Sequence, residues 1–285
     1  MVFRSVLMIS LILMFSCKSI SCRSNGRTTV VTKNNQVMIN GKSIVCPSGS
    51  SISIINDAVY INGKLYSDLE IVEGSGTMVT EKREIVDFNK LQVSAPVEVN
   101  VSLGNDFKCS VEADDNLIPL IFSEVKDNIL YISIKESFST KNKIKIFIET
   151  PELKRINLSG NGQITGYVSM VEELIVSGSG NVNITGINGG SLSAMLSGSG
   201  GIALQGVLKD DLNVTFSGSG DVNTRKLKVS KANVVLNGSG DVSIFANHEI
   251  SVAISGSGDV KCYGGPQKIE KKIWGSGSFK NYEGN

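Results

Sequence analysis

The sequence predicts an all-β protein, a right-handed parallel β-solenoid (β-helix) with coils of about 20 residues and an N-terminal β-hairpin extension. Three observations predict it. A Gly/Ser phrase recurs at a nearly constant interval, apolar and polar residues alternate on both sides of each phrase, and 30 glycines stand against only 5 prolines. A unit of about 20 residues cannot bury an apolar face alone, so the copies are expected to stack and share one interior.

The recurring phrase has the form Ser-Gly-Ser-Gly, followed by one polar and one apolar residue. Its copies, some of them imperfect, begin at Ser159, Ser177, Ser197, Ser217, Asn237, Ser255 and Trp274, at intervals of 18, 20, 20, 20, 18 and 19 residues. Glycine tolerates positive φ, so each phrase is expected to form a tight corner between two strands. Such a glycine density excludes a helical repeat, and a β-propeller, the alternative repeat fold, needs blades of about 40 residues.

Apolar columns flank the phrases. The residues directly before three successive phrases are Leu196, Phe216 and Leu236, and those just after them are Ile202, Val222 and Val242. Alternation with a period of two indicates strands with one buried face. We therefore expect Leu196, Phe216 and Leu236 to lie one above another in the interior, and parallel crossovers favour a right-handed coil.

Three segments are expected along the chain: a signal peptide at 1–22, the β-hairpin extension at 23–72 and the solenoid domain at 73–285, with its Gly/Ser repeats at 159–278. In the extension, Asn-Gly pairs at 40–41 and 62–63 give the strongest short hairpin signal. The tail at 279–285 is expected to cap the end of the solenoid. Lys271 and Lys272 should discourage end-to-end pairing of strand edges.

The beginning of the chain resembles a targeting segment. A positive charge at Arg4 and an apolar run at 6–15 match a secretory signal, and the run is too short to span a bilayer. Ser16 and Cys17 follow at once, as at the cleavage site of a bacterial lipoprotein. We therefore expect a lipid anchor at Cys17 that attaches the protein to a membrane. Ordinary cleavage after Ser21 is the alternative.

The cysteines give no metal or redox motif. They stand at 17, 22, 46, 109 and 262, and no two have Cys-x-x-Cys spacing. Cys46 and Cys109 could form a disulfide bond after export, and the sequence leaves this possibility open. The favoured interpretation is that Cys46, Cys109 and Cys262 are free thiols buried in strands.

One column of residues could bind a metal. Asp221, Asp241 and Asp259 follow the phrase in three coils, so stacking would bring their carboxylates about 5 Å apart. Calcium takes about six to eight oxygen ligands, which such a column could begin to supply. Gly201 interrupts the column, and the simpler interpretation is carboxylates solvated at a corner. His248 is the only histidine, so Ser-His-Asp chemistry has no support.

Four stretches carry a resemblance to a known family. They are GSGTMVTEKREIVDFNKLQVSAPVEVNV at 74–101, VEADDNLIPLI at 111–121, LKRINLSGNGQITG at 153–166 and the SGSGDV repeats. In this order they resemble the auto-transporter adhesin, head GIN domain family, over about residues 74–280. The resemblance implies a β-helical, adhesin-like protein, often a lipoprotein, in the periplasm, at the outer membrane or on the cell surface. It implies no catalytic residues, because none is established for the family.

Composition and motifs together favour a binding protein over an enzyme. The 28 Lys+Arg against 27 Asp+Glu lack the basic excess of a nucleic-acid binder. We expect an exported cell-envelope binding module, without catalysis or a cofactor, whose polar faces contact a surface glycan or a protein. The alternatives are a structural protein that maintains the envelope and a β-helix enzyme acting on polysaccharides. The enzyme would need clustered Asp, Arg or Lys residues on one face, and the strand positions after the phrase show no such cluster.

Overall fold

The computed structural model describes residues 72–135 and 138–283, together with the backbone of seven strands between residues 20 and 66. The chain divides into two compact units, 1–71 and 72–285. No helix of the described residues is long and apolar enough to cross a membrane.

The first unit contains two small antiparallel sheets. Both hairpins predicted from the Asn-Gly pairs are present, since β3 pairs with β4 and β6 pairs with β7. The four-stranded sheet consists of β1 (Ile20–Ser24), β2 (Thr28–Lys33), β3 (Gln36–Ile39) and β4 (Lys42–Ile44). The three-stranded sheet consists of β5 (Ile52–Ile55), β6 (Ala58–Ile61) and β7 (Lys64–Tyr66).

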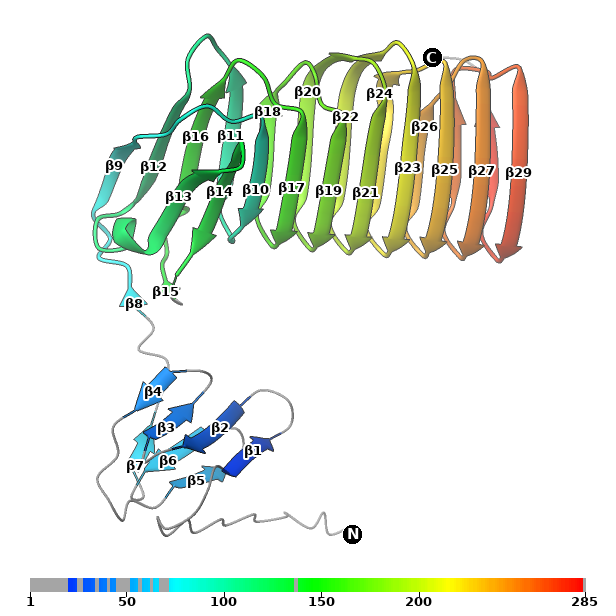
Figure 1. Ribbon diagram of the computed structural model, residues 1–285. Helices are drawn as coiled ribbons and strands as arrows, with labels where there is room; N and C mark the ends of the chain where they lie inside the picture. The colour runs from blue at the N-terminus through cyan, green and yellow to red at the C-terminus, as the bar shows by residue number, and fades with distance from the viewer. Residues whose placement is uncertain are drawn as a thin grey trace, which may run out of the picture. The chain divides into compact units, whose positions relative to one another are not determined.

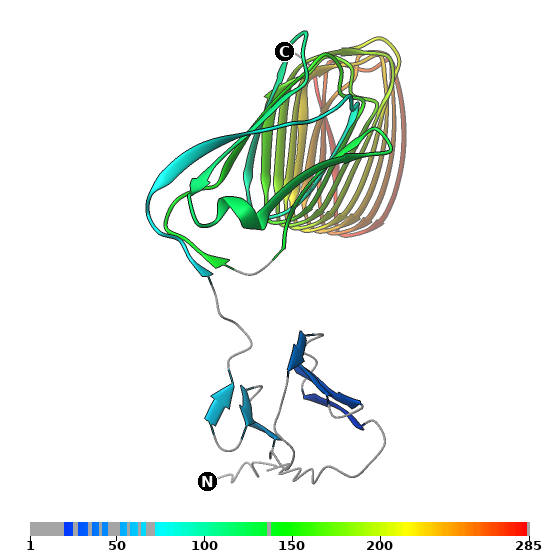
Figure 2. The same ribbon diagram turned by 60° about the vertical axis from the view of Figure 1, so that its left-hand side comes forward.

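The second unit is a parallel β-solenoid in which each coil adds one strand to each of two facing sheets (Figures 1 and 2). The ten-stranded sheet contains, in order, β13 (Ile121–Lys126), β14 (Ile129–Ile134), β10 (Lys90–Ser94), β17 (Arg155–Gly160), β19 (Glu173–Gly178), β21 (Leu192–Gly198), β23 (Asp211–Gly218), β25 (Lys231–Gly238), β27 (Glu249–Gly256) and β29 (Lys268–Gly275). In Figure 1 the coil winds in the predicted right-handed sense as it advances from β17 toward β29.

The eleven-stranded sheet forms the other side of the solenoid. It contains, in order, β30 (Phe279–Tyr282), β28 (Val260–Tyr263), β26 (Asp241–Phe245), β24 (Asp221–Lys228), β22 (Gly201–Leu208), β20 (Asn181–Gly189), β18 (Gln163–Tyr167), β11 (Glu98–Leu103), β16 (Lys145–Thr150), β12 (Lys108–Asp114) and β9 (Met78–Arg83). A short pair, β8 (Val72–Glu73) with β15 (Phe138–Ser139), and the 3₁₀ turn η1 (Ile118–Leu120) complete the described elements.

The interior is built as the repeat predicts. Strand pairing places Leu196 beside Phe216 and Phe216 beside Leu236, and all three side chains are buried. The opposite sheet adds Ile202, Val222 and Val242, which are also buried. The prediction of a shared core of stacked apolar columns is therefore confirmed.

The Gly/Ser corner uses its glycines in two ways. Gly218 has φ of 141°, which side-chain-bearing residues rarely adopt. The carbonyl oxygen of Gly198 accepts hydrogen bonds from the amides of Ser219 at 2.9 Å and Gly220 at 3.3 Å in the next coil. A Cβ on Gly220 would lie 1.8 Å from the carbonyl oxygen of Gly200. The second glycine of the phrase is therefore required by the close approach of successive coils.

The two ends of the solenoid differ. At the N-terminal end, Leu117 before η1 is buried, and Arg83 donates hydrogen bonds to the carbonyls of Ile118 and Ile121. At the C-terminal end the prediction that the tail caps the solenoid is wrong. Phe279–Tyr282 forms β30, a further parallel strand on β28, because Phe279 continues the inward apolar column of Val260. The edges of β29 and β30 therefore have no covering strand among the described residues.

Candidate functional site

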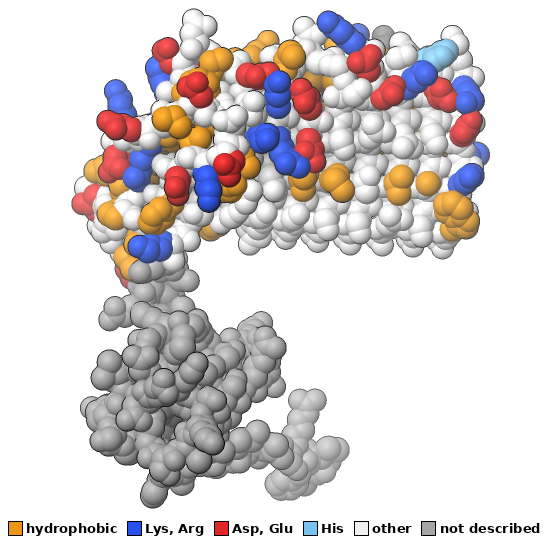
Figure 3. All heavy atoms as spheres, in the orientation of Figure 1, with side chains coloured by type: hydrophobic (Ala, Val, Ile, Leu, Met, Phe, Trp, Pro, Cys, Tyr) orange, Lys and Arg blue, Asp and Glu red, His pale blue; other side chains and the backbone are white. Residues whose placement is uncertain are grey.

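The outer face of the eleven-stranded sheet carries regular columns of polar side chains. Strand alternation turns every second residue outward, and parallel pairing without a shift aligns equivalent residues of successive coils. One column contains Gln163, Asn181, Gly201, Asp221 and Asp241, and the next contains Thr165, Asn183, Ala203, Asn223 and Ser243. Figure 3 shows the face of the ten-stranded sheet, where charged side chains gather over the N-terminal strands and along one edge.

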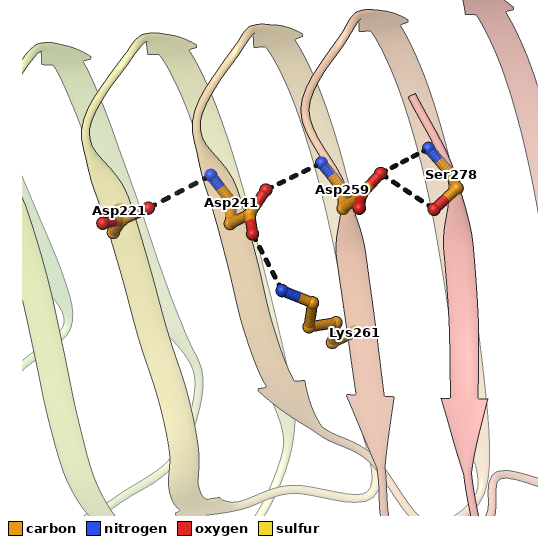
Figure 4. Close-up of polar contacts among 5 residues, drawn as sticks. All are labelled: Asp221, Asp241, Asp259, Lys261 and Ser278. Carbon is orange, nitrogen blue, oxygen red and sulfur yellow. Dashed lines mark hydrogen bonds and ion pairs between the residues drawn. The ribbon is translucent and has the colours of Figure 1, made fainter. Parts of the chain in front are cut away.

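The three aspartates predicted to share one column do so, and each carboxylate serves the next coil (Figure 4). The amide of Asp241 donates to Oδ1 of Asp221 at 3.2 Å, and the amide of Asp259 donates to Oδ1 of Asp241 at 3.1 Å. The amide and hydroxyl of Ser278 both donate to Oδ1 of Asp259 at 2.8 Å. The column is therefore a hydrogen-bonded ladder that satisfies amides at the strand starts.

The ladder does not have the arrangement of a metal centre. Lys261 donates from Nζ to Oδ2 of Asp241 at 2.8 Å, and this hydrogen bond is the main reason that the pKa of Asp241 is lowered. Both carboxylate oxygens of Asp241 are thus already engaged. In the part of the chain that the structure describes, no group of three or more His, Cys, Asp or Glu side chains could hold a metal ion. The geometry favours structural corner carboxylates over the calcium site.

A depression interrupts the columns at the coil of β22. Gly201 and Ala203 are much smaller than their neighbours in both adjacent coils, and they floor a hollow of about 520 Å³, which we call the notch. Its polar lining side chains are Gln163, Asn181, Asn183, Ser199, Ser219, Asp221 and Asn223. The amide oxygen of Asn181 reaches over Gly201, where a Cβ would lie 2.7 Å from it. In the sequence, Gly201 interrupts the aspartate column, and the missing side chain at this position is the signal for the hollow.

An exposed aromatic ring stands on the same outer face, on β18, two strands from β22 in the sheet order. Tyr167 at the end of β18 is 58% exposed and pairs with Thr185, two residues beyond Asn183. A Cβ on Gly186 would lie 2.3 to 2.6 Å from three atoms of the Tyr167 ring, so the ring lies against the Gly186 backbone. Around the coils of β18 to β24, the outer face therefore combines the amides and the Asp221 carboxylate of the notch with the exposed ring of Tyr167.

The remaining candidate residues are cysteines and His248, and none of those in the described part of the chain belongs to a possible metal-binding group. Cys109 and Cys262 are buried free thiols, as predicted, and burial raises the pKa of each to about 11. Such thiols are protonated at neutral pH and are poor nucleophiles. His248 is exposed in a bend. Cys17 and Cys46 lie outside the described residues.

Comparison with known proteins gives one family and several solved folds. The family model described as "Putative auto-transporter adhesin, head GIN domain" matches residues 87–266. No curated protein matches the chain.

Crystal structures of bacterial proteins share the fold. One described as a putative adhesin from Bacteroides fragilis has 24% identity and a TM-score of 0.68, covering 74% of this chain and 100% of that one. One described as a putative lipid binding protein from Parabacteroides distasonis has 26% identity and a TM-score of 0.62, covering 75% and 100%. One described as a putative adhesin from Parabacteroides merdae has 19% identity and a TM-score of 0.58, with the same coverage.

Proposed function

Because the chain belongs to the putative auto-transporter adhesin, head GIN domain family, we propose that it is an exported adhesin-like protein of the bacterial envelope that binds a glycan without catalysis. The notch on the outer face of the eleven-stranded sheet carries this proposal. Amide and carboxylate groups hydrogen-bond sugar hydroxyls in fixed directions, and the exposed Tyr167 ring offers a flat apolar surface for the C–H face of a sugar.

The absence of a catalytic cluster from the notch agrees with a binding role. Its only ionisable side chain is Asp221, which already accepts the Asp241 amide. General acid–base cleavage of a glycosidic bond usually needs two carboxyl groups on opposite sides of the bond. The notch therefore holds a saccharide by hydrogen bonds and releases it unchanged.

Filling the notch is expected to weaken glycan binding. We expect Ala203→Asn to weaken binding at least tenfold, about 1.4 kcal/mol, because the new side chain occupies the hollow. Asn183 and Asn223 occupy the same column in the adjacent coils, so the fold accommodates asparagine there. Binding would be measured on a panel of immobilised bacterial and host glycans, with product analysis to detect cleavage.

Ser193→Asn is the matched control, since Ser193 lies on the ten-stranded sheet of the same coil and pairs with Asn213. It should bind as the wild type does. If Ala203→Asn binds glycans as tightly as the wild type, the notch is excluded as the binding site. Shortening of the glycan would contradict a non-catalytic role.

We also propose that a lipid at Cys17 attaches the protein to the envelope. Strand β1 begins at Ile20 and pairs Cys22 with Val30. Processing directly before Cys17 leaves this strand whole, whereas cleavage after Ser21 would remove its first two residues. Acyl chains on the cysteine would contribute about 0.8 kcal/mol of membrane affinity for each buried CH₂.

Metabolic labelling with a radiolabelled fatty acid tests the anchor. The wild type should incorporate the label, Cys17→Ala should lose it completely, and Cys22→Ala should keep it. An unlabelled wild type, or a Cys17→Ala variant that still carries label, would refute the anchor.

A further inference from the structure

Among the described residues, no strand pairs with the outer side of β29 or β30, so the C-terminal end of the solenoid is an open edge of both sheets. Strand β29 pairs with β27 on one side, and β30 pairs with β28. Along β29, Ile269 and Ile273 are 39% and 38% exposed and Trp274 is 61% exposed. Unpaired amides and carbonyls beside exposed apolar side chains form a template on which a further strand can add.

A lysine interrupts the apolar column at this edge. Pairing with the buried residues of β27 places three residues of β29 on the inward side: Ile269, Lys271 and Ile273. The Lys271 ammonium lies 5.9 Å from the ring centroid of Phe279, the inward aromatic of β30. A strand added to β29 would therefore meet an apolar, a basic and an apolar side chain in turn.

The positive charge of the lysines at the C-terminal end of the solenoid favours an acidic partner. Lys268 contacts two acidic side chains, with Nζ 2.6 Å from Glu249 and 2.8 Å from Glu270. Within residues 72–135 and 138–283, no carboxylate forms an ion pair with the other lysines of the two edge strands, which are Lys271, Lys272 and Lys280. A second copy packed end to end would bring these lysines against their own equivalents, which like-charge repulsion opposes. A strand bearing carboxylates would be attracted instead.

We infer that this end accepts an extended acidic segment of a partner protein, which adds as a strand to β29. Its inward side chains would be apolar, acidic and apolar, with the carboxylate facing Lys271. Backbone hydrogen bonds would supply strand pairing, and the central acid would supply specificity. This surface is separate from the notch and does not depend on glycan binding.

Synthetic peptides based on the sequence of β27 test the inference. Strand β27 already pairs with one edge of β29, so a peptide of similar sequence is suited to pair with the other edge of β29. In the sequence EISVAISG, glutamate or lysine replaces the valine to give EISEAISG or EISKAISG. Fluorescent forms would be titrated into the full chain. We expect the glutamate peptide to bind at least tenfold more tightly than the lysine peptide, and Lys271→Glu to reverse this preference.

Lys226→Glu is the matched control, since it makes the same charge change on β24, at an exposed position away from this end. It should leave the preference for the glutamate peptide unchanged. Thermal unfolding would verify that each variant is folded, and the glycan assay would show that the notch is intact. The inference is overturned if neither peptide binds, if Lys271→Glu does not reverse the preference, or if the wild type dimerises through this end in sedimentation experiments.

Discussion

Replacing Gly220 with alanine is expected to destabilise the solenoid by about 3 kcal/mol or more. The added Cβ would lie 1.8 Å from the carbonyl oxygen of Gly200. That oxygen belongs to the backbone and accepts the amide of Asp221 at 3.2 Å. The two coils would have to separate locally, which would lengthen this hydrogen bond and loosen the core behind the corner.

Urea unfolding of the two proteins would measure the effect, with Gly189→Ala as the matched control. The nearest atoms to a Cβ on Gly189 are 3.8 and 3.9 Å away, which is ordinary contact. Gly189→Ala should change stability by less than about 1 kcal/mol, since alanine restricts the unfolded chain. If both variants unfold at the wild-type urea concentration, the coils do not approach as closely as the structure shows.

The solenoid could be predicted from the sequence because two independent features of the repeat indicate it. Phrase spacing aligns the corners, and the columns containing Phe216 and Val222 align the two inner faces. The sequence alone does not predict the structural role of each glycine. Sequence reasoning explained glycines by positive φ, which holds for Gly218, whereas Gly220 is required by contact with the coil below. Distances between coils follow only from the stacked backbone.

The candidate site could be predicted only in part. The sequence places Asp221, Asp241 and Asp259 in one column, but it does not show that backbone amides and Lys261 already occupy the carboxylates. A missing side chain, as at Gly201, appears in a sequence as an interruption, and it becomes a hollow only when larger neighbours stand on both sides. The tail predicted as a cap adds one more strand, β30, to the eleven-stranded sheet, because Phe279 pairs with Val260 in the inward column.

Phe216→Ala should destabilise the protein by about 3–5 kcal/mol, because it removes a fully buried ring from the middle of the stack. Leu196 and Leu236 flank Phe216 in adjacent coils, and backbone ladders fix their spacing on both sides. A Cβ on Gly240 would lie 2.5 Å from Cζ of Phe216, so the ring also packs directly on that glycine. The walls of the cavity are therefore held by hydrogen-bonded strands and cannot close around alanine.

Phe147→Ala is the control for aromatic truncation, since Phe147 on β16 faces outward and is 41% exposed. It should cost less than about 1.5 kcal/mol, because water already covers much of its ring. The two free energies of unfolding would come from urea denaturation followed by circular dichroism. Because the coils are joined by strand pairing across Phe216, its loss should lower the unfolding midpoint of the whole solenoid. Similar costs for the two variants would mean that the stacked interior does not hold the coils together.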